Sequence, residues 1–220
     1  MANINSSYVG LRKDILRHIK GSNLIVLDIG SATGENGKYL IENNIASQVI
    51  GVEIDESMAE LSRGKLTNLI VGNIETQEVK NQLPNNLYYD FILLGDVLEH
   101  LNNPWELLNY LTALLKPEGQ VIISLPNVQH IEVFIQVFLK GKWPYNQRGI
   151  FDKTHLRWFT YKNIIELINS SNLSIVKLER NFRFRDKQGS KFPFYGMVLK
   201  KVFKNIYTHQ FIIVCKKNLK

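Results

Sequence analysis

The first residues that could do chemistry lie in a glycine-rich loop after a short apolar run. The loop extends from Asp28 to Gly37 and reads DIGSATGENG. Glycine permits positive φ and a close approach of the backbone to a ligand. Ala32 replaces the second glycine of the dinucleotide fingerprint G-x-G-x-x-G, so a dinucleotide is not indicated. Asp28 would repel a pyrophosphate, but it suits a ligand that carries an ammonium and a sulfonium group.

Two polar residues follow at the ends of the next two apolar runs. Glu53 ends GVE and comes after the loop at a spacing of about 20 residues, where Rossmann-like folds place an acid on the ribose hydroxyls. Asn73 follows the run NLIVG, and its side-chain carbonyl can accept a hydrogen bond. Loop, acid and amide therefore indicate a nucleoside-containing ligand.

The segment VLDIGSATGENGKYL resembles motif I of the class I S-adenosylmethionine (SAM) methyltransferases, and residues 91–127 resemble their post-I and motif III region. The resemblance implies SAM as cofactor and S-adenosylhomocysteine as product. It assigns Glu53 to the ribose, Asn73 to the adenine amine, and Asp96 to the vicinity of the methionine moiety. The cofactor-binding residues predicted in this way are Asp28, Gly30, Ser31, Ala32, Gly34, Glu53, Ile54, Asn73, Ile74, Gly95, Asp96 and Val97.

A second motif, FDKTHLRWFT at 151–160, is similar to the D-x-T-H-L-R-F-F-T signature of bacterial methyltransferases often associated with cell-surface polysaccharide biosynthesis. This resemblance implies O-methylation of a small hydroxylated acceptor: a sugar, a glycan precursor or a related metabolite. His155 is the candidate base, because imidazole titrates near neutral pH. The alternative is that His155 and Arg157 only attach this segment to the sheet.

Asp96, Glu99 and His100 share one face of a helical turn, since they are spaced i, i+3 and i+4. With His155 they form a set that could bind a divalent ion. A similar layout occurs in the RNA 3′-end 2′-O-methyltransferases and the ubiquinone-pathway O-methyltransferases. In the alternative, Asp96 faces SAM, Glu99 bonds to the backbone and His100 packs under a lid. His155 and His100 are thus the predicted catalytic residues, and a divalent metal is left open.

The elements that must position these residues alternate between apolar runs and helical patterns. Strands are predicted at 24–29, 47–54, 68–72, 89–95 and 119–126, helices at 34–44, 56–65 and 104–115, and a turn at 116–119. Unbroken apolar strands that alternate with helices are typical of a parallel sheet covered on both faces. We predict an α/β fold: a Rossmann-like, doubly wound, mostly parallel seven-stranded sheet with an antiparallel last strand and a lid insertion after strand 5.

The flanking segments complete this plan. We expect helices at 8–20, 128–140 and 161–170, a lid at 141–156, and strands at 173–184 and 209–217. Residues 1–220 would then form one methyltransferase domain, with a SAM-binding half at about 8–126, a lid or acceptor insertion at 127–160, and a C-terminal part at 161–220 that completes the sheet. His18, His130 and His209 are expected to be surface or packing residues.

Composition fits one globular domain, because 45% of the 220 residues are hydrophobic and 21% are charged. The single cysteine excludes an internal disulfide. The apolar runs fall short of the roughly 20 residues of a membrane span. The first 20 residues contain no apolar signal-peptide core, so we expect a cytoplasmic protein.

The net charge of +7 is unevenly distributed, with +10 in residues 177–220 and −3 in the rest. Such asymmetry indicates an anionic partner: nucleic acid, an anionic membrane surface or a phosphorylated acceptor. The alternative is that the basic end simply faces solvent. An RNA methyltransferase that uses this basic segment is one alternative. Because the chain has no recognised RNA-binding module, a small-molecule or glycan acceptor is favoured over nucleic acid. A SAM-binding subunit without activity is the other alternative, and the oligomeric state is left open.

Overall fold

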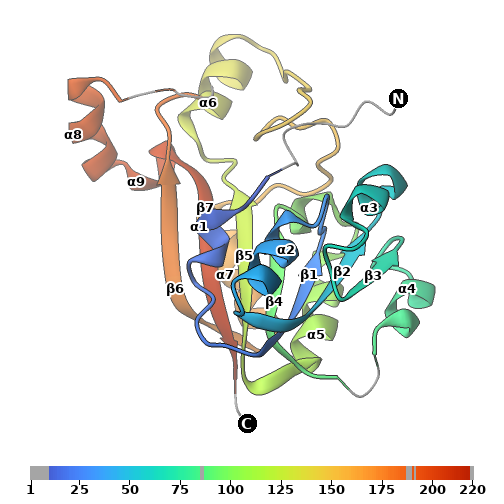
Figure 1. Ribbon diagram of the computed structural model, residues 1–220. Helices are drawn as coiled ribbons and strands as arrows, with labels where there is room; N and C mark the ends of the chain where they lie inside the picture. The colour runs from blue at the N-terminus through green and yellow to red at the C-terminus, as the bar shows by residue number, and fades with distance from the viewer. Residues whose placement is uncertain (1–9, 85–86, 187–189, 191, 219–220) are drawn as a thin grey trace.

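Seven strands form one sheet in the order β3-β2-β1-β4-β5-β7-β6 in the computed structural model, which describes residues 10–84, 87–186, 190 and 192–218 (Figure 1). The strands are β1 Leu24–Ile29, β2 Ala46–Glu53, β3 Asn68–Val71, β4 Tyr89–Gly95, β5 Leu115–Pro126, β6 Leu173–Phe182 and β7 Thr208–Lys217. Strands β1 to β5 pair in parallel, whereas β7 runs antiparallel to β5 and β6. The predicted fold class is confirmed.

Helices lie on both faces of the sheet. The α-helices of the described residues are α1 Lys13–Leu16, α2 Glu35–Glu42, α3 Glu56–Ser62, α4 Gln77–Gln82, α5 Pro104–Ala113, α6 Ile131–Val133, α7 Tyr161–Ser170, α8 Phe194–Val202 and α9 Lys204–Tyr207, of which α6 and α8 extend beyond the sheet (Figure 1). Val26 of β1 belongs to a buried cluster with α1 and α2, and the next residue, Leu27, belongs to a second cluster with α5 and α7. Successive strand side chains point to opposite faces. Burial on both faces therefore explains the continuous apolar strands.

The predicted turn at 116–119 is wrong, because these residues lie inside β5. Leu115 pairs with Tyr89 of β4, but the next pair joins Gln120 to Phe91, so the extra residues form an irregularity in the strand. A Cβ atom on Gly119 would lie 2.7 Å from the carbonyl oxygen of Tyr89. The glycine thus permits a close backbone approach within the sheet rather than a turn outside it.

Two predicted helices are shorter or less regular than expected. The helix predicted at 8–20 is limited to α1 in the described part of the chain, which excludes Tyr8. The helix predicted at 128–140 begins as α6 and continues as a π-helical turn from Phe134 to Leu139. None of the six residues of this turn is buried, so packing does not enforce a regular α-helix there.

The direction of β7 brings a late part of the chain to the carboxyl edge of the parallel strands. Gln210 pairs with Pro126, the last residue of β5. The segment between β6 and β7, which contains α8 and α9, therefore extends from the same edge as the glycine-rich loop after β1 (Figure 1). No helix among the described residues is long and apolar enough to cross a membrane.

Candidate functional site

A cavity of about 730 Å³ opens at the carboxyl ends of β1, β2 and β4. Its lining includes every predicted cofactor-binding residue except Gly34: Asp28, Gly30, Ser31, Ala32, Glu53, Ile54, Asn73, Ile74, Gly95, Asp96 and Val97. The carboxyl edge of a parallel sheet is the usual ligand position in doubly wound folds, because loops from several strands converge there. Sequence reasoning thus selected residues that the fold does bring together.

Two glycines give the loop after β1 its shape. Gly30 has φ of +70°, and a Cβ atom there would lie 2.7 Å from a methyl carbon of Val97. Gly34 has φ of +76° and precedes α2, and its Cβ would lie 2.9 Å from that of Ser62. Gly34 was predicted to contact the cofactor, but it lies outside the cavity lining and instead allows α2 to approach α3.

Asp28 is the last polar side chain of β1 and is buried, with 2% of its surface exposed. Its Oδ2 atom has no hydrogen-bond partner within the described residues. Burial, reinforced by the nearby Glu53 carboxylate, raises the pKa of Asp28 to about 7. A hydrogen bond from Asn36 and the charge of Arg12 oppose this shift without cancelling it. A buried acid with one oxygen that lacks a partner among the described residues suits a ligand that brings positive charge into the cavity.

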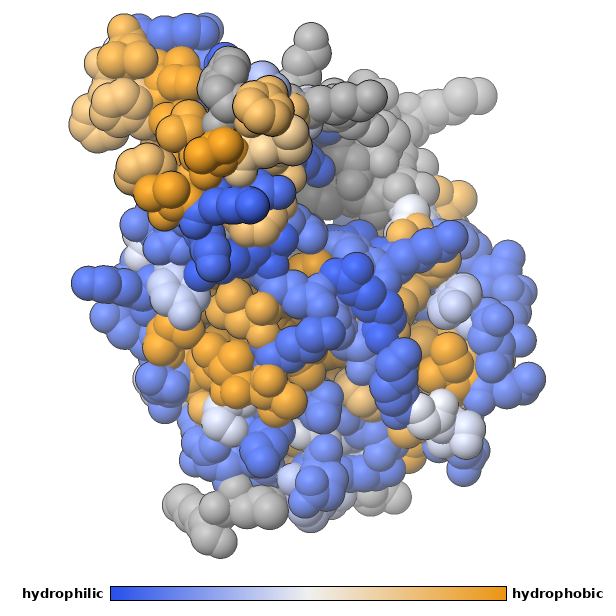
Figure 2. Space-filling view, turned by 90° about the vertical axis from the view of Figure 1, so that its left-hand side faces the viewer, coloured by the Kyte–Doolittle hydropathy of each residue, from blue (hydrophilic) through white to orange (hydrophobic). Residues whose placement is uncertain are grey.

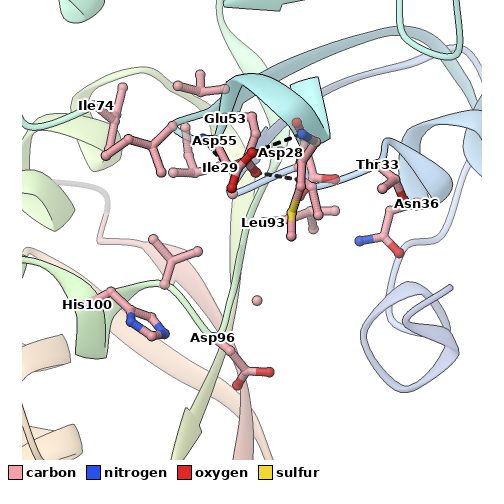
Figure 3. Close-up of a pocket in the computed structure, with 18 of the residues that line it drawn as sticks. Asp28, Ile29, Thr33, Asn36, Glu53, Asp55, Ile74, Leu93, Asp96 and His100 are labelled. Carbon is pink, nitrogen blue, oxygen red and sulfur yellow. Dashed lines mark hydrogen bonds between the residues drawn. The ribbon is translucent and has the colours of Figure 1, made fainter. Parts of the chain in front are cut away.

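Glu53, at the end of β2, is held by the backbone. Its Oε2 accepts the N–H of Ala32 at 2.7 Å, and its Oε1 accepts the N–H of Asp55 at 2.9 Å (Figure 3). Each carboxylate oxygen retains a further lone pair for a ligand hydroxyl. The Oδ1 atom of Asn73 similarly accepts the N–H of Glu75 at 2.9 Å. Both predicted nucleoside contacts are therefore fixed in place before a ligand arrives.

Asp96, just after β4, lies on the other side of the cavity in the view of Figure 3, together with His100. Its carboxylate forms an ion pair with Arg12, at 2.6 Å between Nη1 and Oδ2. Ser124 and Gln210 donate hydrogen bonds to its Oδ1 atom at 2.8 and 2.6 Å. Strands β5 and β7 and the segment before α1 thus meet at one carboxylate.

A second cavity, of about 630 Å³, adjoins the first, since Asp96 and His100 line both. Its lining is mainly polar: Asp96, Glu99, His100, Pro126, Asn146, Gln147, Arg148, Gly149, Asp152, His155, Arg183, Asp186, His209 and Gln210. His155, the predicted base, lies here rather than in the first cavity. Adjoining cavities of this kind can hold a cofactor and an acceptor side by side.

Glu99, His100 and His155 form a compact group in which one ligand atom of each lies within 4.8 Å of the others. Burial raises the pKa of Glu99 well above its usual range, and its Oε2 atom has no hydrogen-bond partner among the described residues. Burial and the neighbouring His100 lower the pKa of His155 to about 4, which keeps the imidazole neutral. This donor set fits a divalent cation.

The four-residue metal set considered from the sequence needs correction. Asp96 lies outside the compact group, because Arg12, Ser124 and Gln210 already hold its carboxylate. The carbonyl oxygen of Glu99 accepts the backbone N–H groups of Leu156 and Arg157 at 2.8 and 2.9 Å, so this turn does attach the lid to the sheet.

Sequence reasoning missed His209, which was expected to be a surface or packing residue. It is buried and lines the second cavity, with its Nδ1 atom 3.8 Å from Oδ1 of Asp186. Arg183 and Arg148 line the same cavity. The position of His209 could have been inferred from the predicted antiparallel last strand. The first residues of such a strand must lie beside the carboxyl end of the strand it pairs with, here β5.

Residues 8–178 match the family model described as a methyltransferase domain. The mitochondrial ubiquinone biosynthesis O-methyltransferase of Dictyostelium discoideum is 22% identical over 171 residues, which cover 78% of this chain and 49% of the relative. The ubiquinone biosynthesis O-methyltransferase of Rickettsia bellii (strain OSU 85-389) is 24% identical over 165 residues, covering 72% and 65%. The chain thus spans about half to two thirds of the length of these relatives.

Solved structures share the fold. An S-adenosylmethionine-dependent methyltransferase from Mesorhizobium loti superposes with a TM-score of 0.62 at 14% identity, covering 92% of this chain and 95% of that one. The [4+2]-cyclase SpnF superposes with a TM-score of 0.64 at 14% identity, covering 94% and 80%. Since a protein described as a cyclase shares the fold, the fold alone does not define the reaction.

Proposed function

Because the chain belongs to the methyltransferase domain family, we propose that it transfers the methyl group of SAM to an oxygen of a small hydroxylated acceptor. The chain is a class I SAM-dependent methyltransferase, and the acceptor and the methylated atom are the proposed part. The observation that supports them is the pair of adjoining cavities, which share Asp96 and His100. The first would hold SAM and the second the acceptor.

The first cavity suits SAM in charge and shape. Glu53 would accept hydrogen bonds from the ribose hydroxyls, and the turn at Asn73 would contact the adenine. Asp28 would face the positively charged methionine end, where its burial strengthens the attraction. Backbone N–H groups already hold the Glu53 side chain, so SAM binding costs little side-chain conformational entropy at this residue.

The acceptor is proposed to be a sugar, a glycan precursor or a related metabolite. The amides, carboxylates and guanidinium groups of the second cavity match vicinal hydroxyls better than an apolar ring. Residues from the FDKTHLRWFT motif contribute to it, since Asp152 and His155 both line this cavity. Two of the similar proteins are named O-methyltransferases, and this supports oxygen as the methylated atom.

In the proposed reaction the acceptor oxygen attacks the methyl carbon, the carbon–sulfur bond breaks, and S-adenosylhomocysteine leaves. The hydroxyl proton passes to His155, which is neutral before the reaction, and the carboxylates of Asp152 and Asp96 would stabilise the imidazolium that forms. The protein mainly aligns oxygen and sulfonium and removes this proton. His100 lines both cavities and would help to align the acceptor beside SAM.

A divalent cation held by Glu99, His100 and His155 is a second candidate for activating the acceptor. The observation that favours it is the group of three ligand atoms within 4.8 Å of one another, in which Oε2 of Glu99 has no hydrogen-bond partner among the described residues. A bound cation would supply Lewis-acid chemistry, which lowers the pKa of an acceptor hydroxyl. Activity that disappears with EDTA and returns with Mg²⁺ or Mn²⁺ would support it, and full activity in excess EDTA would exclude it.

Calorimetry with SAM, followed by methyl transfer into separated cell-extract fractions, tests the proposal. We expect SAM to bind, and labelled methyl to enter the small-molecule or glycan fraction. Label in the RNA fraction, removable by ribonuclease, would instead support an RNA methyltransferase. SAM binding with no labelled product in any fraction would indicate a non-catalytic subunit.

A further inference from the structure

The segment between β6 and β7 exposes an apolar surface that the reaction does not use. Helix α8 projects away from the sheet in Figure 1, and its hydrophobic side chains gather in the upper part of Figure 2. Phe194 is 82% exposed, Val202 69% and Val198 58%. Exposed large apolar side chains of the segment are Phe194, Met197, Val198, Val202, Phe203 and Ile206.

These residues follow helical spacing. Phe194, Met197, Val198 and Val202 stand at i, i+3, i+4 and i+8 of α8, so they form one continuous stripe. In a soluble monomer such a stripe normally faces the core, where its burial stabilises the fold. Here it faces outward, and large exposed apolar patches usually mark an interaction surface.

The charges beside the stripe are all positive. Lys201 and Lys204 are exposed at the end of α8 and the start of α9. No aspartate or glutamate occurs anywhere from 187 to 220. Lys200 differs from its neighbours, because its Nζ lies 5.0 Å from the ring centroid of Phe182 and 5.2 Å from that of Phe192. It stabilises the base of the segment, whereas Lys201 and Lys204 are available to a partner.

The insertion after β5, residues 127–160, adds a second exposed apolar group at the same edge of the sheet. Phe138 is 72% exposed, and its ring stacks on that of Phe134 at a centroid distance of 5.6 Å. Lys140 and Lys142 follow directly and are also exposed. In Figure 1 the α6 segment and α8 both lie beyond the carboxyl ends of the strands, on the side where the cavities open.

We propose that α8 and α9, supported by the lid, dock the protein onto an anionic lipid bilayer with the acceptor cavity close to the membrane surface. An apolar stripe flanked by lysines is the pattern of helices that lie in the interfacial plane. Anionic lipids would attract the lysines, and the aromatic side chains would enter the headgroup region. Charge complementarity favours this partner over a second copy of the chain, because a copy would bring the same positive charges into contact.

Co-sedimentation of the full chain with lipid vesicles tests the docking. We expect binding to vesicles that contain phosphatidylglycerol, weakening as salt rises, and much weaker binding to pure phosphatidylcholine. The double variant Lys201→Glu/Lys204→Glu should lose about tenfold or more in affinity. The variant Phe194→Ser/Val198→Ser should also detach. Both change exposed side chains only, and an unchanged SAM affinity would show that the fold is retained.

The matched control is Lys20→Glu/Lys216→Glu. It makes the same charge change at exposed lysines near the opposite edge of the sheet, and it should bind vesicles like the wild type. Equal vesicle binding by wild type and the α8 variants would overturn the proposal. So would a dimer in solution that the Phe194→Ser/Val198→Ser variant dissociates, or binding to RNA in place of vesicles.

Discussion

Arg12 and Asp96 form an ion pair that links the start of the chain to the shared wall of the two cavities. The Nη1 atom of Arg12 lies 2.6 Å from Oδ2 of Asp96, and about a quarter of each side chain is exposed. The backbone N–H of Arg12 also donates to Oδ1 of Asn36, at the beginning of α2. The pair therefore positions the carboxylate that stands between the two cavities.

Breaking this pair should destabilise the fold. Arg12→Met leaves the Asp96 carboxylate without its cation, and we expect the free energy of unfolding to fall by about 1–3 kcal/mol, below the cost for a fully buried pair. Urea denaturation measures it. Adding Asp96→Asn should recover part of the loss, because an amide needs no cation. Strictly additive effects in this double-mutant cycle would show that the pair contributes nothing.

Removing the Glu53 carboxylate should weaken SAM binding. Glu53→Ala removes charge-assisted hydrogen bonds to the ribose, which contribute roughly 1.5–3 kcal/mol, so the dissociation constant should rise about 10- to 100-fold. Calorimetry measures it. Glu60→Ala is the matched control, since this exposed residue lies outside the first cavity and forms an ion pair with surface Arg63. An unchanged constant for Glu53→Ala would refute the ribose assignment.

The affinity for SAM should rise with pH around neutrality. The raised pKa of Asp28, about 7, leaves part of the protein protonated at pH 7, and only the carboxylate attracts the cationic ligand. Binding below pH 7 must therefore release a proton, which calorimetry in buffers of different ionisation enthalpy detects. Asp28→Asn should abolish both the release and the pH dependence. A wild-type affinity that is flat between pH 6 and 8 would contradict this role.

Without SAM, the Asp28 carboxyl should make the folded protein less stable as pH rises, whereas it makes SAM binding stronger. A folded-state pKa above that of the unfolded chain means that the folded protein holds the proton more tightly. The contribution of Asp28 to stability is thus fully present below pH 4 and is lost as pH rises through about 7. Saturating SAM should reduce this loss, and thermal unfolding with and without SAM checks it.

His155 should affect turnover without affecting the cofactor. His155→Ala is expected to leave SAM affinity unchanged, because His155 lines the second cavity and not the first, and to lower turnover by about 10²- to 10⁴-fold. His18→Ala is the control, since His18 contacts Glu179 outside both cavities. Wild-type turnover in His155→Ala would remove His155 from the mechanism.

Much of this arrangement was predictable because local patterns determine it. The loop at Gly30 and the acid at Glu53 follow strands whose apolar runs are continuous, so their positions at the carboxyl edge follow from parallel pairing. The three members of the candidate metal group, Glu99, His100 and His155, were all predicted, and only the addition of Asp96 was wrong. The partners of Asp96 could not be predicted, because Arg12 and Gln210 are distant from it in sequence and only the tertiary fold brings them together.

The exposed apolar stripe of α8 was also missed from the sequence. Phe194 and Val198 have the spacing of an ordinary buried helix face, and only the packing shows that nothing covers them. The basic end was noticed through its net charge of +10, but its geometry needed the structure. Charge composition can indicate a partner class, whereas the surface that meets the partner depends on how the elements pack.

The central claim, methyl transfer from SAM to an oxygen of a small acceptor, is tested most directly by identifying the labelled product. The enzyme would be incubated with SAM labelled with ¹³C in the methyl group and with the small-molecule fraction of cell extract. Carbon NMR of the purified product should show one enriched methoxy signal, with S-adenosylhomocysteine formed in equal amount. An enriched N-methyl or C-methyl signal, or no enriched product, would contradict the claim.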